Sequence, residues 1–171
     1  MEVTVLNNQT SKLGDYLTGA IRDSTSVRFA VAYVSSSGLD LIAEPLETCL
    51  TNGGEIELLV GLDFQATDPT ALRTIQAWQS SYTGLDLYCY IDKPGEIYHP
   101  KLYLLESGSG AATGITGSSN LTAGGLRKNV EVNVAFVGNN TATVWEQLVS
   151  TYVLLRQLPG RVAPDADFLS T

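Results

Sequence analysis

The stretch Val27-Arg28-Phe29-Ala30-Val31-Ala32-Tyr33-Val34 is a nearly continuous run of β-forming residues. Such a run is typical of a strand buried on both faces, as in a parallel sheet. Around it we predict strands over 3–6, 56–62 and 85–91, and helices over 11–23, 36–50 and from 68 through 78. Asp68 and Pro69 mark the start of the last helix, because aspartate caps helices and proline fits their first position. This alternation of strands and helices predicts a largely parallel sheet with helices on its faces.

The second half of the chain has a different pattern. Strands are predicted over 101–105, 111–116 and 130–137, with connections that leave little room for helices between the first two, so we expect hairpin-like pairing there. A closing helix over 143–158 and an irregular tail from about residue 159 complete the pattern. We therefore predict one α/β domain over residues 1–171, with a mixed, largely parallel sheet flanked by helices on both faces.

The composition fits one domain of ordinary size. The chain has 171 residues, 44% of them hydrophobic, and a formal net charge of −8. No apolar run approaches the roughly 20 residues of a membrane span, and no secretory signal is visible, so we expect a cytoplasmic protein. Cys49 and Cys89 stand alone in apolar contexts and are predicted to be buried, reduced thiols. With one histidine, a conventional zinc site is not expected.

Several polar residues stand close to the ends of the predicted strands of the second half. His99 and Lys101 flank the start of one strand and share a face, because side chains two apart in a strand point the same way. Ser118 and Asn120 follow the next strand, and Glu131 is placed at the start of the third. Three neighbouring strands are therefore expected to bring a nucleophile or base, a cation, small donors and a carboxylate together.

The order His99-x-Lys101, then Glu106, then Gly117-Ser118-Ser119-Asn120, then Glu131 resembles the HKD signature of the phospholipase D superfamily. The segments 117–122 and 129–131 are more similar to its nuclease branch, which includes small bacterial endonucleases, some restriction enzymes and nuclease-like domains attached to helicases. The family usually has aspartate where this chain has Glu106. That position is mostly structural in the family, so Glu106 is left out of the catalytic set.

The resemblance implies a role for each matched residue. His99 would attack phosphorus and form a covalent phosphohistidine. Glu131 would orient the imidazole through its other nitrogen. Lys101, Asn120 and Ser118 would hold the phosphate oxygens, where charge builds in the transition state. No metal or other cofactor is implied, because lysine and amide donors neutralise that charge.

The resemblance also implies a homodimer. The leaving oxygen needs a general acid, and the chain has no second histidine. Family members with one copy of the motif pair two chains across a two-fold axis, so that one active site is shared at the interface.

The function implied is that of a metal-independent phosphodiesterase acting on nucleic acid, with DNA as the expected substrate. A separate specificity or helicase partner is compatible with the absence of a recognition domain, and no membrane contact is expected. Two alternatives stay open: a hydrolase or transferase acting on phospholipid headgroups, and a phosphodiester-binding module without turnover.

Some further residues have two interpretations. Arg127 and Lys128 are candidate contacts to the nucleic-acid backbone, or merely solvated side chains of a loop. Asp63 either lines the site at a strand end or caps a turn. Trp78 and Trp145 lie at helical spacing and are predicted to be core residues rather than platforms for bases.

Overall fold

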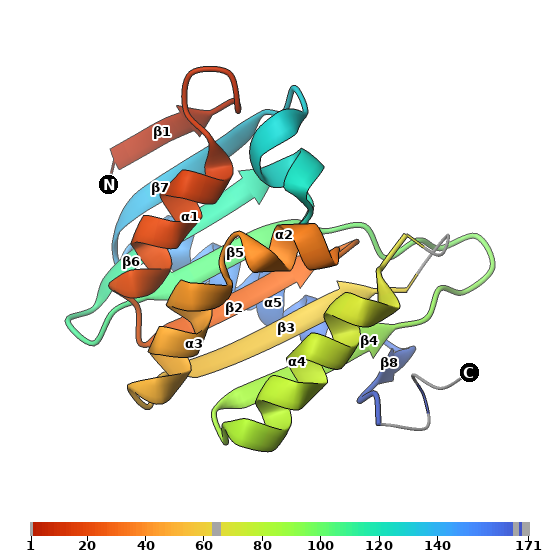
Figure 1. Cartoon of the computed structure of the whole chain (residues 1–171). Coiled ribbons are helices and arrows are strands. Elements are labelled where there is room, and N and C mark those ends of the chain that lie inside the picture. The colour runs from red at the N-terminus through yellow and green to blue at the C-terminus, as the bar shows by residue number, and fades with distance from the viewer. Residues whose placement is uncertain (1, 63–65, 166–167, 169–171) are drawn as a thin grey trace.

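The computed structural model describes residues 2–62, 66–165 and 168. Within them a single sheet has the strand order β1-β7-β6-β5-β2-β3-β4-β8 (Figure 1). The strands are β1 Glu2–Leu6, β2 Ser26–Val31, β3 Glu55–Gly61, β4 Leu85–Tyr90, β5 Lys101–Glu106, β6 Ala111–Gly117, β7 Asn133–Asn139 and β8 Arg161–Val162. The helices are α1 Leu13–Arg22, α2 Ser36–Asp40, α3 Ala43–Thr51, α4 Pro69–Ser81, α5 Thr143–Arg156 and the short π-helix η2 Gly124–Lys128.

The sheet is mixed, as predicted, but parallel pairing is confined to β2, β3 and β4. The other neighbouring strands pair antiparallel, so the expectation of a largely parallel sheet is wrong. Connection length explains part of the difference: only residues 107–110 join β5 to β6, and a parallel pair needs a crossover of about a dozen residues or more. Because β5 runs opposite to β2, the start of β5 lies beside the end of β2.

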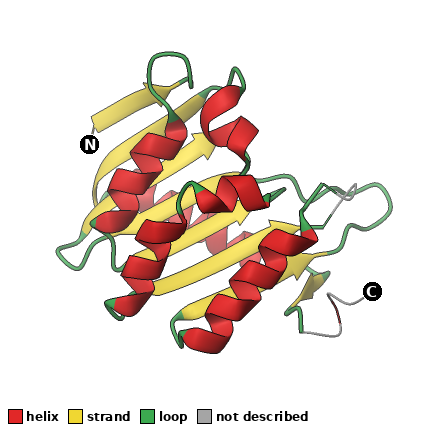
Figure 2. Cartoon of the chain, viewed as in Figure 1, coloured by secondary structure: helices red, strands yellow, loops and turns green. Residues whose placement is uncertain are grey.

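Helices cover both faces of the sheet, which confirms that prediction (Figure 2). One core lies between the sheet and α1 to α4, and includes Leu17, Leu46 and Ile75. A second core lies under α5 and includes Tyr152. Trp78 belongs to the first core and Trp145 to the second, so both tryptophans are core residues as predicted. Cys49 and Cys89 are buried free thiols, as expected.

The helix predicted over 36–50 is divided into α2 and α3. Pro45 explains the division, because proline lacks the N–H that would bond to the Leu41 carbonyl of a continuous helix. It is tolerated in the first turn of α3, where no such bond is needed. The Leu41 carbonyl accepts a hydrogen bond from Thr18 Oγ1 at 3.4 Å instead. The break therefore leaves the Leu41 carbonyl, in the turn between α2 and α3, available to Thr18 of α1.

The start of α4 is as predicted, with Asp68 as its N-cap. The Asp68 carboxylate accepts hydrogen bonds from the N–H and hydroxyl of Ser36 and from the N–H of Thr70. These bonds, those of Ser36 above all, lower the pKa of Asp68 to about 2. The cap therefore links α2 to α4 and stays ionised near neutral pH.

Two boundaries differ from the prediction. The strand predicted over 130–137 begins only at Asn133, so Glu131 lies in the preceding loop rather than at a strand start. In the segment predicted as an irregular tail, Arg161–Val162 forms β8 and pairs with β4. Asp63 lies outside the described residues. None of the helices in the described ranges is long and apolar enough to cross a membrane.

Candidate active site

His99 and Lys101 lie against each other at the start of β5. Lys101 is the first residue of β5 and is paired with Val31, the last residue of β2. Its Nζ lies 2.7 Å from His99 Nδ1 and 3.1 Å from Nε2, and it donates a hydrogen bond to the His99 carbonyl oxygen at 3.1 Å. The imidazole is exposed and the lysine is half-buried. The structure thus brings a cation into direct contact with the only imidazole of the chain.

The segment that follows β2 joins this pair to the rest of the site. Ala32 N–H donates to the Pro100 carbonyl at 2.9 Å, which holds the backbone next to His99. Tyr33 N–H donates to Asn120 Oδ1 at 3.2 Å, and Leu121 N–H donates to the Tyr33 carbonyl at 3.2 Å. The extension of β2 therefore brings the predicted residues from before β5 and from after β6 together.

Tyr33 is a site residue that sequence reasoning missed. Its ring meets the His99 ring edge to face, with the centroids 5.7 Å apart and an angle of 74° between the planes. Sequence reasoning assigned Tyr33 to a buried strand and gave it no functional role. A usable signal was its place at the carboxyl end of that strand, where ligands collect in α/β sheets. This ring contact restricts the orientation of the imidazole.

Asn120 is held with its amide nitrogen available to an anion. Its Oδ1 is occupied by Tyr33 N–H, and within the described residues no hydrogen bond uses its Nδ2. The backbone of Asn120 is packed closely against η2: a Cβ on Gly125 would lie 2.4 Å from the Asn120 carbonyl oxygen. Glycine at this position therefore permits the close approach that fixes Asn120.

Glu131 is bound to Ser118 rather than to His99. Ser118 Oγ donates to Glu131 Oε2, and Asn129 Nδ2 donates to Oε1 at 3.3 Å. Among the hydrogen bonds of the described residues, none joins Glu131 to the imidazole, so the expected orienting contact is not formed in this structure. Desolvation lowers the pKa of the Lys101 amine, and the Glu131 carboxylate is close enough to oppose that shift. Glu131 therefore belongs to the site as a negative charge beside the lysine.

A buried network supports the loop that carries Ser118 and Asn120. Ser119 is fully buried, and its N–H donates to Asn133 Oδ1 at 3.2 Å, while Asn133 Nδ2 donates to Ser119 Oγ at 2.9 Å. The hydroxyl of Tyr103 donates to the Ser119 carbonyl at 2.8 Å. Every backbone polar group of Ser119 is thus satisfied inside the protein, which fixes the residues on either side of it.

Replacing Asn133 with alanine is expected to destabilise the fold by about 2–4 kcal/mol, because it leaves the N–H and hydroxyl of Ser119 buried without partners. Asn140→Ala is the matched control, since Asn140 is exposed and donates a single hydrogen bond to Glu106. The control should change stability by about 0.5 kcal/mol or less. Urea unfolding of the two variants measures this difference, and equal midpoints would contradict the role given to Asn133.

The electrostatics of the site favour a neutral imidazole. Partial desolvation lowers the pKa of His99 from its usual 6.5, the charge of Lys101 lowers it further, and Asp92 opposes the shift. Desolvation also lowers the pKa of Lys101, against the effect of Glu131. A protonated lysine can donate only to an unprotonated ring nitrogen. At neutral pH the histidine is therefore in the form that can act as a nucleophile.

The pKa of His99 is expected to rise in Lys101→Gln, because the cation that opposes its protonation is removed. In Asp92→Asn it is expected to fall, because a stabilising negative charge is lost while an oxygen remains for the Tyr98 N–H, now bound at 2.8 Å. The chain has one histidine, so a single set of ring resonances reports the titration by proton NMR. Shifts of the same sign in both variants would contradict this account.

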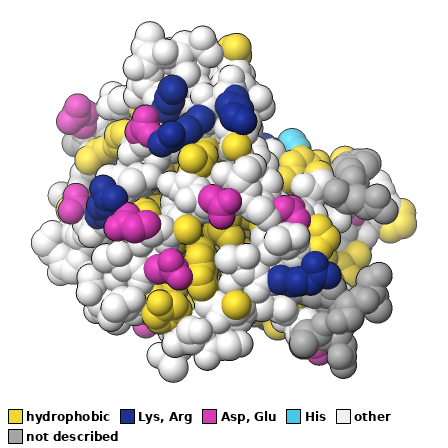
Figure 3. Space-filling view, viewed as in Figure 1, with side chains coloured by type: hydrophobic (Ala, Val, Ile, Leu, Met, Phe, Trp, Pro, Cys, Tyr) yellow, Lys and Arg dark blue, Asp and Glu magenta, His cyan; other side chains and the backbone are white. Residues whose placement is uncertain are grey.

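The other charged residues of the predicted pattern are Arg127, Lys128 and Glu106. Arg127 and Lys128 are exposed at the end of η2, and Arg127 forms an ion pair with Asp15 of α1 at 2.5 Å. Figure 3 shows lysine and arginine side chains gathered over that part of the surface, with the histidine at the nearby edge. Lys93 is exposed in the loop after β4. Glu106 lies at the opposite end of β5 from Lys101 and accepts a hydrogen bond from Asn140.

The described part of the chain contains no group of three or more His, Cys, Asp or Glu side chains that could hold a metal ion. A family model described as "Cardiolipin synthase, PLD-like domain" matches residues 17–152, which include every predicted catalytic residue. The chain belongs to the phospholipase D superfamily. No curated protein sequence matches it.

Three solved structures share the fold. Nuc from Salmonella typhimurium, a phospholipase D family member, superposes with a TM-score of 0.71 at 17% identity, over 96% of this chain and 99% of Nuc. Phosphatidylserine synthase from Haemophilus influenzae gives a TM-score of 0.71 at 13% identity, over 95% of this chain and 40% of the synthase. Yeast tyrosyl-DNA phosphodiesterase gives 0.55 at 11% identity, over 90% of this chain and 41% of that enzyme.

Proposed function

We propose that this chain is a phosphodiesterase that cleaves nucleic acid, with DNA as its substrate, through a phosphohistidine intermediate and without a metal ion. One observation carries the proposal: Lys101 Nζ lies 2.7 Å from a ring nitrogen of a histidine whose pKa is lowered. A neutral nucleophile is thus paired with a cation that can hold a phosphate oxygen. The free amide nitrogen of Asn120 is a further donor for the same group.

In the first step a ring nitrogen of His99 attacks phosphorus, and the bond from phosphorus to the leaving oxygen breaks. Lys101, Asn120 and Ser118 stabilise the charge on the oxygens that stay on phosphorus. In the second step water attacks phosphorus and the P–N bond breaks, which regenerates the histidine and releases a phosphate monoester. Substrate binding is expected to reorganise Ser118 and Glu131, because Ser118 now donates to that carboxylate.

The proton required by the leaving oxygen supports the proposal of a homodimer. One histidine cannot attack phosphorus and protonate the leaving oxygen in the same step. A second copy of the chain would supply its own His99 as the acid, in the protonated form that the negative charge of a bound phosphate favours. That imidazole would accept the proton of the attacking water in the second step.

Phospholipid headgroups are the second candidate substrate, favoured by the description of the matching family model and by the likeness to phosphatidylserine synthase. Two observations favour nucleic acid. The basic residues of η2 lie beside the site, and the apolar side of α1 is buried rather than available to a lipid surface.

Incubation with supercoiled plasmid and with single-stranded DNA in excess EDTA tests the proposal. Nicking or degradation by the purified protein is the expected result, and cleavage that stops on chelation would contradict it. Parallel incubation with vesicles of phosphatidylglycerol and phosphatidylserine tests the lipid alternative through headgroup release. Binding of DNA without any turnover of either substrate would identify a phosphodiester-binding module and overturn the catalytic proposal.

A further inference from the structure

A group of basic side chains lies on the surface beside the site, where the start of α1 meets η2. Lys12 is the N-cap residue of α1, and Arg127 and Lys128 end η2. All three are exposed, and Asp15 is the acidic side chain paired with one of them. In Figure 3 the lysines and arginines of this region form a patch with one acidic side chain among them. The protein as a whole carries a formal charge of −8, so this patch is a local exception.

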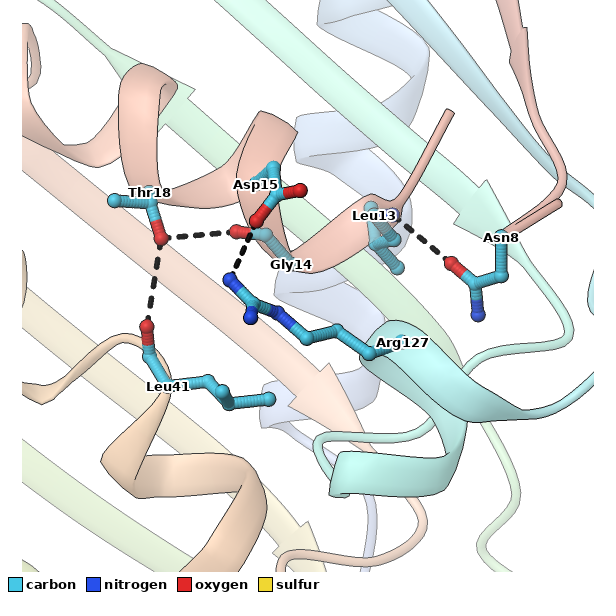
Figure 4. Close-up of polar contacts among 7 residues, drawn as sticks. All are labelled: Asn8, Leu13, Gly14, Asp15, Thr18, Leu41 and Arg127. Atoms are coloured by element: carbon cyan, nitrogen blue, oxygen red, sulfur yellow. Dashed lines mark hydrogen bonds and ion pairs between the residues drawn. The ribbon is translucent and has the colours of Figure 1, made fainter. Parts of the chain in front are cut away.

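Asn8 fixes the start of α1 to η2. It is 4% exposed and has a positive φ of 59°. Its Oδ1 accepts from Leu13 N–H at 3.0 Å, as Figure 4 shows, and its Nδ2 donates to the Gly125 carbonyl at 2.8 Å. One buried side chain therefore bonds to both elements that carry the basic residues, which holds Lys12 near the end of η2.

Because α1 packs closely on η2, the side chain of Arg127 lies along α1. A Cβ on Gly14 would lie 3.3 Å from the Leu126 carbonyl oxygen and 3.4 Å from Arg127 Cγ, so glycine permits this contact. The guanidinium then reaches Asp15 in the next position of α1 (Figure 4). The patch is thus built on packed elements rather than on a free loop.

The same segment connects the patch to the candidate catalytic residues. η2 packs on the backbone of Asn120 through Gly125. The residue after η2, Asn129, donates to Glu131. Residues 120–131 therefore link the basic patch to the candidate site, so a polyanion whose reacting phosphate lies at His99 has Arg127 and Lys128 on the same segment as Asn120.

We infer that Lys12, Arg127 and Lys128 form a second contact surface for the nucleic-acid backbone, which binds phosphates flanking the one that reacts, and that Asp15 weakens it by pairing with Arg127. This inference rests on the proposed function. Charges farther away than a Debye length of about 8 Å are largely screened at physiological ionic strength. These three basic side chains, rather than the acidic groups elsewhere on the protein, therefore govern contact with the strand. A bilayer is a poorer partner, because Leu13, Leu17 and Ile21 of α1 are buried in the core.

Oligonucleotide binding by the catalytically silent His99→Ala protein tests the inference. Fluorescent single strands of about 6 and about 30 nucleotides are titrated at several salt concentrations, since short strands fill only the central site. Lys12→Gln and Lys128→Gln, each in this background, are expected to weaken binding of the long strand about 3- to 10-fold and to reduce the salt slope by about 0.7. Asp15→Asn is expected to strengthen binding, because it releases Arg127. Arg22→Gln is the control, since Arg22 lies at the other end of α1 and pairs with Glu44.

Opposite effects of Lys12→Gln and Asp15→Asn on the long strand support the surface, because a merely structural role would not reverse sign with charge. Unchanged affinity and salt slope in all three test variants would overturn it, provided that they melt like the parent. Weakened binding to phosphatidylglycerol vesicles with unchanged oligonucleotide binding would also overturn it. Turnover of plasmid by wild type reports separately on the proposed function, so failure of one can be told from failure of the other.

Discussion

Replacement of His99 with alanine is expected to lower the rate of DNA cleavage by about 10⁴-fold or more, which corresponds to at least about 5.5 kcal/mol in activation free energy. The variant loses the atom that forms the bond to phosphorus, and Lys101 and Asn120 remain to bind the substrate. Binding of DNA should therefore persist while turnover stops. The fold should be retained, because His99 is exposed and surface replacements typically change stability by about 0.5 kcal/mol or less.

The measurement compares wild type, His99→Ala and Lys93→Gln on the same DNA in EDTA. Lys93→Gln removes an exposed positive charge from the loop that precedes His99, and it controls for a general loss of charge near the site. Alkaline quenching of wild type during turnover, followed by mass spectrometry, should detect a phosphoryl adduct on the peptide that contains His99. Equal cleavage by wild type and His99→Ala would remove the histidine from the mechanism.

A heterodimer of one wild-type and one His99→Ala chain is expected to cleave DNA at a rate about 10²- to 10⁴-fold below that of the wild-type dimer, the range that a general acid contributes. It retains one nucleophile but lacks the second imidazole that would protonate the leaving oxygen. An aryl phosphodiester such as bis(p-nitrophenyl) phosphate needs little protonation of its leaving group. The heterodimer should therefore still release p-nitrophenol from it in a first turnover.

Two affinity tags on co-expressed chains allow the heterodimer to be isolated, and sedimentation gives its stoichiometry. A doubly tagged wild-type dimer is the control. Heterodimers that retain half of the wild-type rate on DNA would show two independent sites, and a monomer with full activity would exclude a shared one. Either result would contradict the dimeric proposal without affecting the assignment of His99 as nucleophile.

Local patterns along the chain were enough to predict most of the elements. Alternation of apolar runs and helical spacing identified the strands, and Asp68 with Pro69 marked the start of α4. The proximity of His99 and Lys101 also followed from local geometry, because residues two apart in an extended segment share a side. The break between α2 and α3 was missed, although Pro45 was a visible signal for it.

Contacts between distant residues could not be read from these patterns. Asn120 bonds to Tyr33, 87 positions earlier, and Asn8 bonds to Gly125, 117 positions later. The bond between Ser118 and Glu131 likewise depends on a loop whose strand begins later than predicted. Each of these depends on the order and register of β2, β5, β6 and β7, which periodicity within one segment does not specify.

By itself, the sequence determined an α/β domain of the phospholipase D type and the presence of one histidine beside one lysine. Only the tertiary structure decided that Tyr33 flanks the imidazole and that Glu131 accepts a hydrogen bond from Ser118. It also decided that Asn8 links the start of α1, next to Lys12, to η2. The physical reason is that propensity and spacing act over a few residues. Neighbours across a sheet are selected by the burial of apolar faces and by pairing of backbone groups over the whole chain.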